Sequence, residues 1–193
     1  MTTKKGAATR LRIVEAAAAE IRERGTNATT LDDVGRRSGT GKSQLFHYFP
    51  QGREELLLAV AQLEAERVFD DQQPYLDELV SRAAWEAWRD LVVVQYRDQG
   101  LYCPLGVLIS EVGRHSPAAR AVTAELVRRW QACLRAGIEA TQAAGEADPA
   151  LDADRTAAAL LATVQGGVTV LLSTGSADHL EAGLTLCLDR ILV

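Results

Sequence analysis

Apolar residues recur at helical spacing along most of the chain, and glycines and prolines interrupt them at short intervals. Between residues 9 and 24 an apolar side chain returns every three or four positions, which predicts an amphipathic helix. Its apolar positions are Leu11, Val14, Ala18 and Ile21. Gly25 follows, and glycine often ends a helix in the left-handed conformation. The basic residues 1–8 precede this pattern, and we expect them to form a mobile arm.

Two shorter helical patterns come next, separated by a Ser-Gly pair. Thr30 stands three residues before Asp33, which predicts a capping box with Asp in place of the usual Glu or Gln. The second pattern covers residues 42–48 and turns Leu45 and Phe49 inward. A short helix, a tight turn with glycine and a second short helix together predict a helix-turn-helix unit.

The second helix of such a unit enters the major groove of DNA with its first residues toward the base edges. Lys42, Ser43 and Gln44 occupy these positions. Their ammonium, hydroxyl and amide groups are the types that pair with guanine, with several bases and with adenine. The other residues predicted at the DNA contact, mainly toward phosphates, are Thr29, Thr30, Thr40, His47, Tyr48 and Arg53.

The same segment allows a second interpretation, because Gly41-Lys42-Ser43 matches the end of a nucleotide-binding P-loop. The first glycine of that motif belongs at position 36, which is Arg36, and Gly35 is one residue out of register. A P-loop also follows a buried strand, whereas the preceding LDDVGRR is polar and helix-like. A nucleotide-hydrolysing enzyme is therefore the weaker alternative.

We find no other pattern that predicts catalysis. His47, His115 and His179 are scattered and have no metal-ligand spacing with cysteines or acidic residues. No nucleophile, base and acid stand together in a local motif. We therefore expect no catalytic residues, no metal and no cofactor.

The rest of the chain keeps to helical spacing up to its end. The expected helices cover residues 53–70, residues 79–97, a short segment ending at Val112, and a long segment opening at Pro117 with Ser116 as its cap. An exposed acidic loop over residues 145–149 precedes two apolar helices, with caps at Asp152 or Asp154 and at Asp178.

Composition supports an all-α protein of about nine helices. Ala, Leu and Val dominate and aromatics are only 5% of the 193 residues, which favours helix over strand. No apolar run reaches the roughly 20 residues of a membrane span, and no apolar segment follows the basic N-terminus. Three distant cysteines suit a reducing compartment. We expect a cytoplasmic protein without a membrane partner.

The net charge of −5 conceals a difference between the two ends of the chain. Residues 1–60 hold ten basic and seven acidic residues, and residues 61–193 hold eleven basic and nineteen acidic residues. A basic end on an acidic body favours an N-terminal unit that meets a polyanion.

Several segments resemble the DNA-binding domain of the TetR family of bacterial transcriptional regulators over residues 10–63. They read RIVEAA from Arg12, ATTLDDV from Ala28, SGTGKSQLFHYF from Ser38 and EEL from Glu54. The stretches FPQGREEL and CPLG resemble the branch of multidrug-responsive repressors that includes LmrA and YxaF. The chain departs from the family pattern at Phe46, where tyrosine is usual, at Gly41, where serine is frequent and Thr40 could replace its cap, and at Ser43, where glycine is common.

The resemblance implies a division into a helix-turn-helix domain (1–52), a connecting helix (53–73), and a ligand-binding and dimerisation domain (74–193). It implies a repressor that leaves its operator when a small hydrophobic or aromatic molecule binds among the later helices. Gln165 is expected to be buried there on an apolar face. The candidate lining residues are Trp85, Trp88, Tyr96, Tyr102, Cys103, Leu105, Ile109, Trp130, Leu134, Gln165 and Thr169.

The last two helices are apolar around more of their circumference than the core of a single chain needs. Gly166-Gly167 and the surrounding alanines permit close helix approach. As in the family that the chain resembles, we expect a homodimer in which each subunit gives these two helices to a four-helix interface, because a palindromic operator requires a protein with two-fold symmetry. The alternative is that both helices are internal to one chain.

Overall fold

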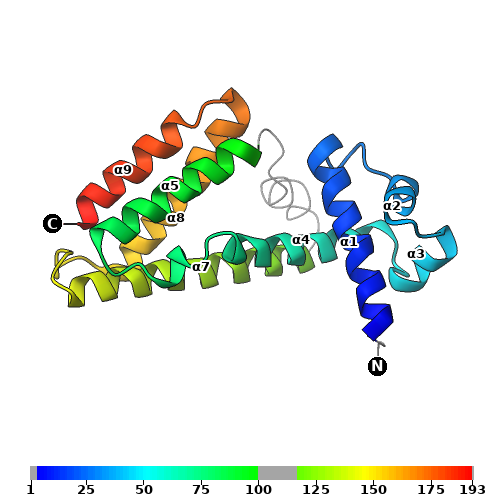
Figure 1. Ribbon diagram of the computed structural model, residues 1–193, viewed down its shortest axis with the longest axis horizontal. Helices are drawn as coiled ribbons and strands as arrows, with labels where there is room; N and C mark the ends of the chain where they lie inside the picture. Colours follow the sequence, from blue (N-terminus) through cyan, green and yellow to red (C-terminus); the bar gives the residue numbers. More distant parts are fainter. Residues whose placement is uncertain (1–3, 100–116, 193) are drawn as a thin grey trace. The chain divides into compact units, whose positions relative to one another are not determined.

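The computed structural model describes residues 4–99 and 117–192, and within them it contains eight α-helices and one short 3₁₀ helix (Figure 1). The all-α prediction is confirmed. The short helix expected to end at Val112 and the cap expected at Ser116 lie outside the described residues. The helices are α1 (Lys4–Arg24), α2 (Leu31–Ser38), α3 (Lys42–Tyr48), α4 (Arg53–Asp70), η1 (Tyr75–Asp77), α5 (Arg82–Gln99), α7 (Pro117–Ala143), α8 (Ala153–Thr174) and α9 (Asp178–Ile191).

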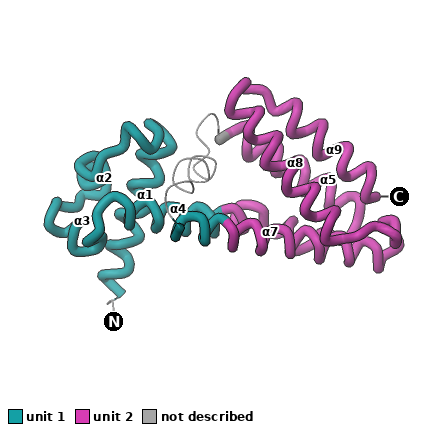
Figure 2. Tube along the Cα trace, turned by 180° about the vertical axis from the view of Figure 1, so that it is seen from behind, with its two compact units in different colours: residues 1–67, 102–123 teal, residues 68–101, 124–193 magenta. Residues whose placement is uncertain are grey.

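The described chain forms two compact units (Figure 2). Unit 1 contains residues 4–67 and 117–123, and unit 2 contains residues 68–99 and 124–192. Helix α4 thus contributes to both units, with its last turn in unit 2. The predicted functional division at residues 52 and 73 stays a prediction.

Unit 1 has a core made by one face of each of its first four helices. The predicted inward residues Leu45 and Phe49 of the α3 segment are buried, as is the stripe of α1. Leu11 is the exception, because 48% of it is exposed. The mobile arm expected over residues 1–8 is wrong from Lys4 onward. This segment lacks proline and contains two alanines, so nothing in it prevents the helix from beginning early.

Unit 2 is built around the apolar stripes of α5 and α7. Trp85 and Trp88 are completely buried, and their rings meet edge to face with centroids 5.7 Å apart. Each indole N–H has an acceptor: Trp85 donates to the hydroxyl of Thr141 at 2.9 Å, and Trp88 donates to the side-chain oxygen of Gln72 at 2.8 Å. The stripe on α7 contributes the buried residues Leu126, Trp130, Leu134 and Ile138.

Helices α8 and α9 pack closely because two glycines lie where they touch. A Cβ atom at Gly167 would be 2.7 Å from the Cα atom of Leu180, and one at Gly183 would be 2.8 Å from the methyl carbon of Thr163. Real Cβ atoms essentially never come this near to another heavy atom. The predicted close approach at Gly167 is therefore confirmed as a contact within the chain, whereas Gly166 faces open space.

The start of α8 confirms one predicted cap, and the start of α9 corrects another. Asp152 caps α8 by accepting the Arg155 N–H at 3.0 Å, whereas Asp178 is the first residue of α9 and not its cap. The hydroxyl oxygen of Ser176 accepts the Asp178 N–H instead, at 3.2 Å.

The acidic loop before α8 is also less exposed than expected. Ala147 is buried and forms an isolated antiparallel bridge with Leu192. The pattern of acidic residues indicated solvent exposure, but the chain end pairs with this loop over a long separation in sequence. No local pattern carries that information.

Helix α8 is long and apolar enough to cross a membrane by length and composition. Only 33% of its most apolar window is buried within the chain. Core helices of proteins that never enter a membrane meet the same criterion.

Candidate nucleic-acid interface

Helix α2 has well-defined ends that set the geometry of the turn after it. The side chain of Thr30 accepts the Asp33 N–H at 3.2 Å, and the Asp33 carboxylate accepts the Thr30 N–H at 3.1 Å, so the predicted capping box is confirmed. At the other end, Gly39 adopts φ 63° and Thr40 donates its N–H to the carbonyl of Gly35 at 2.9 Å. The left-handed residue reverses the chain within one turn, as predicted from the Ser-Gly pair.

Helix α3 follows directly and covers the predicted residues 42–48. Its N-cap is Gly41, with no side-chain cap hydrogen bond. Thr40 does not take over this role, because it is buried and its hydroxyl is directed to the carbonyl of Ser38 at 3.4 Å. The first turn of α3 therefore has no side-chain cap among the described residues.

The polar residues of this first turn point away from the core. Lys42, Ser43 and Gln44 are exposed, while Leu45 and Phe49 are buried and anchor the opposite face of the helix. The guanidinium of Arg10 lies 4.9 Å from the centroid of the Phe49 ring and fixes the end of the α3 segment to α1. This leaves three different polar groups on a rigid, short helix.

The later part of α3 carries further exposed side chains. Phe46 is 40% exposed, His47 is exposed and Tyr48 is half-buried. The rings of His47 and Tyr48 meet at 78° with centroids 5.1 Å apart. These two polar rings lie on the same short helix as the first-turn residues.

Two of the predicted phosphate contacts are held inside unit 1. Thr29 is buried and donates its hydroxyl to the carbonyl of Gly25 at 2.8 Å. Arg53, the first residue of α4, donates to the carbonyls of Thr29 at 2.7 Å and Thr26 at 2.6 Å. Both side chains therefore shape the loop before α2, and their direct contact with DNA stays a prediction.

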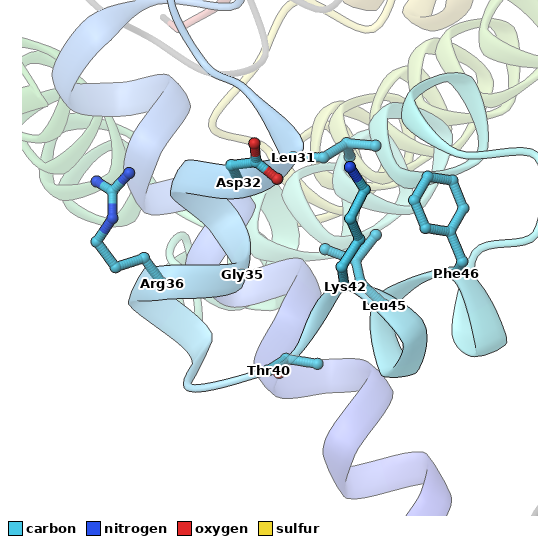
Figure 3. A pocket seen from close by; sticks show the side chains of 8 residues that line it. All are labelled: Leu31, Asp32, Gly35, Arg36, Thr40, Lys42, Leu45 and Phe46. Atoms are coloured by element: carbon cyan, nitrogen blue, oxygen red, sulfur yellow. The ribbon is translucent and has the colours of Figure 1, made fainter.

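A small cavity of about 140 Å³ lies between α2 and α3 (Figure 3). The side chain of Lys42 extends beside it toward Leu31 and Asp32. A P-loop would need a buried strand before this lysine, but helix α2 and the Gly39 turn stand there instead. The structure thus gives Gly41-Lys42-Ser43 the setting of a helix-turn-helix.

A network of ion pairs that sequence patterns did not predict joins α1 to α2. Arg37 contacts Glu20 at 3.0 Å and Glu23 at 2.8 Å, and Arg24 contacts Asp33 at 3.3 Å. These carboxylates raise the pKa of Arg37. The partners lie up to 17 residues apart in sequence, so helical periodicity contains no signal for them.

The Asp33 carboxylate is the most perturbed acid of this network. Hydrogen bonds from the side chain and backbone of Thr30, and then the charge of Arg24, lower its pKa to about 2. Asp33 therefore stays ionised through the physiological range, and its capping bonds stay in place with it.

The predicted effector-lining residues are only partly together. Trp85, Trp88, Trp130, Leu134 and Tyr96 are buried in unit 2. Gln165 is half-buried and not buried as expected, and Thr169 is exposed; in helix α8 the Thr169 hydroxyl donates to the carbonyl of Gln165 at 2.8 Å. The indole N–H of Trp130 is buried and has no hydrogen-bond partner in the described structure. Four predicted residues lie outside the described part: Tyr102, Cys103, Leu105 and Ile109.

A groove on the outer surface of α8 and α9, which the sequence did not single out, has a volume of about 360 Å³. Leu186 stands beside it and is 70% exposed, the most exposed large apolar residue in the described chain. Cys187 is half-buried there, with its sulfur 3.4 Å from the hydroxyl of Thr163. Arg155 and Arg190 also line the groove, so apolar and charged side chains share it.

Comparison with known proteins gives matches over both ends of the chain. The family model described as "Bacterial regulatory proteins, tetR family" matches residues 13–60, and the one described as "Tetracyclin repressor-like, C-terminal domain" matches residues 81–186. Residues 13–60 include α2, the turn and α3, the elements described above.

Relatives and solved structures agree with these matches. The uncharacterized HTH-type transcriptional regulator Rv0196 of Mycobacterium tuberculosis is 31% identical over 135 residues, and YxaF of Bacillus subtilis, described in the same way, is 27% identical over 128 residues. These alignments cover 63% and 64% of this chain, and 64% and 66% of the relatives' length. A TetR transcriptional regulator from Chloroflexus aurantiacus shares the fold, with a TM-score of 0.78 at 24% identity over 99% of this chain and 100% of that structure. The second family model alone takes in more than half of the residues, and the chain therefore belongs to the TetR family of regulatory proteins.

Proposed function

We propose that this protein regulates transcription in the cytoplasm by binding palindromic operator DNA as a homodimer, and that a small hydrophobic or aromatic molecule releases it. The observation that carries the proposal is the first turn of α3. Lys42, Ser43 and Gln44 are exposed together on a helix whose opposite face is anchored in the core. This is the arrangement that a helix needs to present side chains to base edges.

The groups around this turn suit the DNA backbone. Gly41 leaves the first N–H groups of α3 uncapped, and N–H groups at a helix start favour an anion such as a phosphate. His47 and Tyr48 add a ring nitrogen and a hydroxyl on the same short helix. Thr30 caps α2 and Thr40 lies in the turn between α2 and α3. Thr29 and Arg53 hold the loop that precedes α2.

The proposed dimer rests on the uncovered apolar surface of unit 2. Leu186 of α9 is 70% exposed, and α8 presents Gly166 to open space. Two copies that join these helices would cover both surfaces and would place two α3 helices in a two-fold arrangement. A palindromic operator has the same symmetry.

The proposed effector site rests on the aromatic centre of unit 2. Trp85 and Trp88 have hydrogen-bond partners, whereas the buried N–H of Trp130 has none among the described residues. Such a group carries an energetic cost that a ligand with an acceptor oxygen would remove. A ligand releases DNA only if it binds the released conformation more tightly than the DNA-bound one.

Operator binding can be tested with two substitutions in α3. Using DNA from upstream of the protein's own gene, we expect Lys42→Ala and Gln44→Ala each to weaken specific binding by about 5- to 150-fold, since one good base contact contributes about 1–3 kcal/mol. Fluorescence anisotropy of labelled DNA measures the affinity. Arg135→Ala on α7 is the control, because this exposed arginine pairs only loosely with Glu139 at 3.8 Å.

Two results would contradict the proposal. One is unchanged affinity in both α3 variants, with circular dichroism showing that they are folded. The other concerns the effector: a thermal-shift screen of hydrophobic and aromatic compounds supplies binders, and operator affinity that stays unchanged at saturating concentrations of every binder would contradict the proposed release.

A further inference from the structure

The lysines of this chain are unevenly distributed, and the proposed DNA contact of α3 accounts for only one of them. The chain has 21 basic residues but only three lysines, and these are Lys4, Lys5 and Lys42. Lys42 opens α3, and the other two open α1. Residues 1–14 contain four basic residues and no acidic one. The start of α1 is therefore a concentrated positive segment in an acidic protein.

Both N-terminal lysines are exposed and lie in a helix, not in the mobile arm expected from the sequence. Within the described residues, neither forms an ion pair with an acidic side chain. The hydroxyl of Thr9 donates to the carbonyl of Lys5 at 3.0 Å, within the first turns of α1. A lysine on a formed helix loses less conformational freedom on binding than one on a mobile arm.

Contacts in unit 1 fix this end of α1 with respect to α3. The guanidinium of Arg10 lies 4.9 Å from the centroid of the ring of Phe49, the C-cap residue of α3. Ile13 and Val14 are buried in the same core as Leu45. Helix α1 extends back from this contact to its first residue, Lys4, and the six steps from Arg10 to Lys4 correspond to about 9 Å of helix.

We propose that the first turn of α1 is a second DNA contact, in which Lys4 and Lys5 bind backbone phosphates that flank the base pairs met by α3. This inference rests on the proposed function. An ammonium on a flexible stem suits a phosphate as a point charge and carries no sequence information. The lysines of α1 thus add affinity and fix register, while Lys42, Ser43 and Gln44 supply the discrimination.

The test is the salt dependence of operator binding. Each phosphate contact that is lost lowers the slope of log K against log salt concentration by about 0.9. We expect the double variant Lys4→Gln/Lys5→Gln to lower the slope by about 1.8 for each subunit bound. The ratio of affinities for the operator and for an operator with altered central bases should stay unchanged, because phosphate contacts are common to both.

A matched control separates this effect from a general change in charge. Arg128→Gln/Arg135→Gln removes the same two charges from α7, where both arginines are exposed and lie near Glu125 and Glu139. This variant should keep the wild-type slope. An operator duplex shortened at its flanks should give the wild-type protein the lower slope of the lysine variant.

The outcomes distinguish the inference from the function on which it rests. An unchanged slope in the lysine variant, with specific binding that still depends on Lys42, overturns the α1 contact alone. A lower slope accompanied by a lower affinity ratio also overturns it, because the lysines would then take part in base discrimination. Absence of any specific operator binding by the wild-type protein overturns the proposed function itself.

Discussion

Asp33 shows how one side chain serves two structures in this protein. Its carboxylate completes the capping box with Thr30 and pairs with Arg24 of α1. The box was predictable because its two residues stand three positions apart. The ion pair was not, because it joins helices whose relative placement depends on the whole core of unit 1.

The low pKa of Asp33 predicts an acid-sensitive contribution to stability. The folded pKa is about 2, below the ordinary value of 3.8. A lowered pKa means that the contribution is complete above the ordinary value and is lost as the pH falls toward the folded one. We therefore expect the melting temperature of the wild type to exceed that of Asp33→Asn at pH 6, and this difference to shrink between pH 4 and pH 2.

Thermal melts followed by far-ultraviolet circular dichroism measure this difference. Asp32→Asn is the control, because Asp32 is the neighbouring acid on α2 but is exposed and takes no part in the capping box. A wild-type advantage over Asp33→Asn that persists unchanged at pH 2 would contradict the assignment.

Residues with local partners were predicted well, and residues with distant partners were not. Thr30, Leu45 and Phe49 follow from spacing along a single helix. The predicted phosphate contact of Arg53 stays a prediction, but its bonds to two carbonyls 24 and 27 residues earlier in the chain were not expected from the sequence. A surface arginine and a loop-fixing arginine look the same in sequence, since only tertiary structure supplies the acceptors.

At the scale of elements, the bounds of α3 and α4 matched their predicted bounds, while α5 begins later than expected. Leu79, the expected start, is buried outside the helix, and its carbonyl lies 3.1 Å from the hydroxyl of Thr141 on α7. Leu79 also packs where a side chain at Gly137 would stand. The Ser81 hydroxyl accepts the Ala84 N–H at 3.3 Å, as an N-cap residue does, and α5 begins directly after it at Arg82. The apolar periodicity did not include this local signal, and it could not show the contacts of Leu79 with α7.

The glycine pair of α8 gives a direct test of helix packing. We expect Gly167→Ala to lower the free energy of unfolding by about 1–3 kcal/mol, because its Cβ would meet the backbone of Leu180 at 2.7 Å. Within a single chain, Gly166→Ala should instead raise the free energy of unfolding by about 0.5–1 kcal/mol, because its Cβ meets no atom of the described residues and alanine favours helix.

Urea denaturation of both variants at one protein concentration measures the two changes. The substitutions are chemically identical and adjacent in sequence, so helix propensity alone predicts the same effect for both. Equal stabilisation in the two variants would show that α8 and α9 do not approach as closely as described.

For the whole molecule, the uncovered surface of α8 and α9 predicts the oligomeric state. We expect Leu186→Glu to raise the dimer dissociation constant at least tenfold, because burying a carboxylate in an apolar interface without a partner is unfavourable. Sedimentation velocity over a range of concentrations measures the dissociation constant. Specific operator binding should weaken with it, since one subunit reads only half of a palindrome.

Val94→Glu is the control for this experiment. Val94 is 49% exposed on α5, so the substitution adds the same charge outside α8 and α9. A dimer that tolerates Leu186→Glu as well as it tolerates Val94→Glu would place the interface elsewhere on the molecule.

The placement of every tryptophan in unit 2 has a consequence for fluorescence experiments. Trp85, Trp88 and Trp130 are the only tryptophans of the chain, and all three are buried in unit 2. Their emission therefore reports the unfolding of unit 2 and does not report unfolding confined to α1, α2 and α3. Fluorescence and circular dichroism transitions that coincide would show that the two units unfold together. If DNA binds at α3 and the tryptophan emission changes, the binding has altered the surroundings of the tryptophans in unit 2. Such a change would report DNA binding without a label.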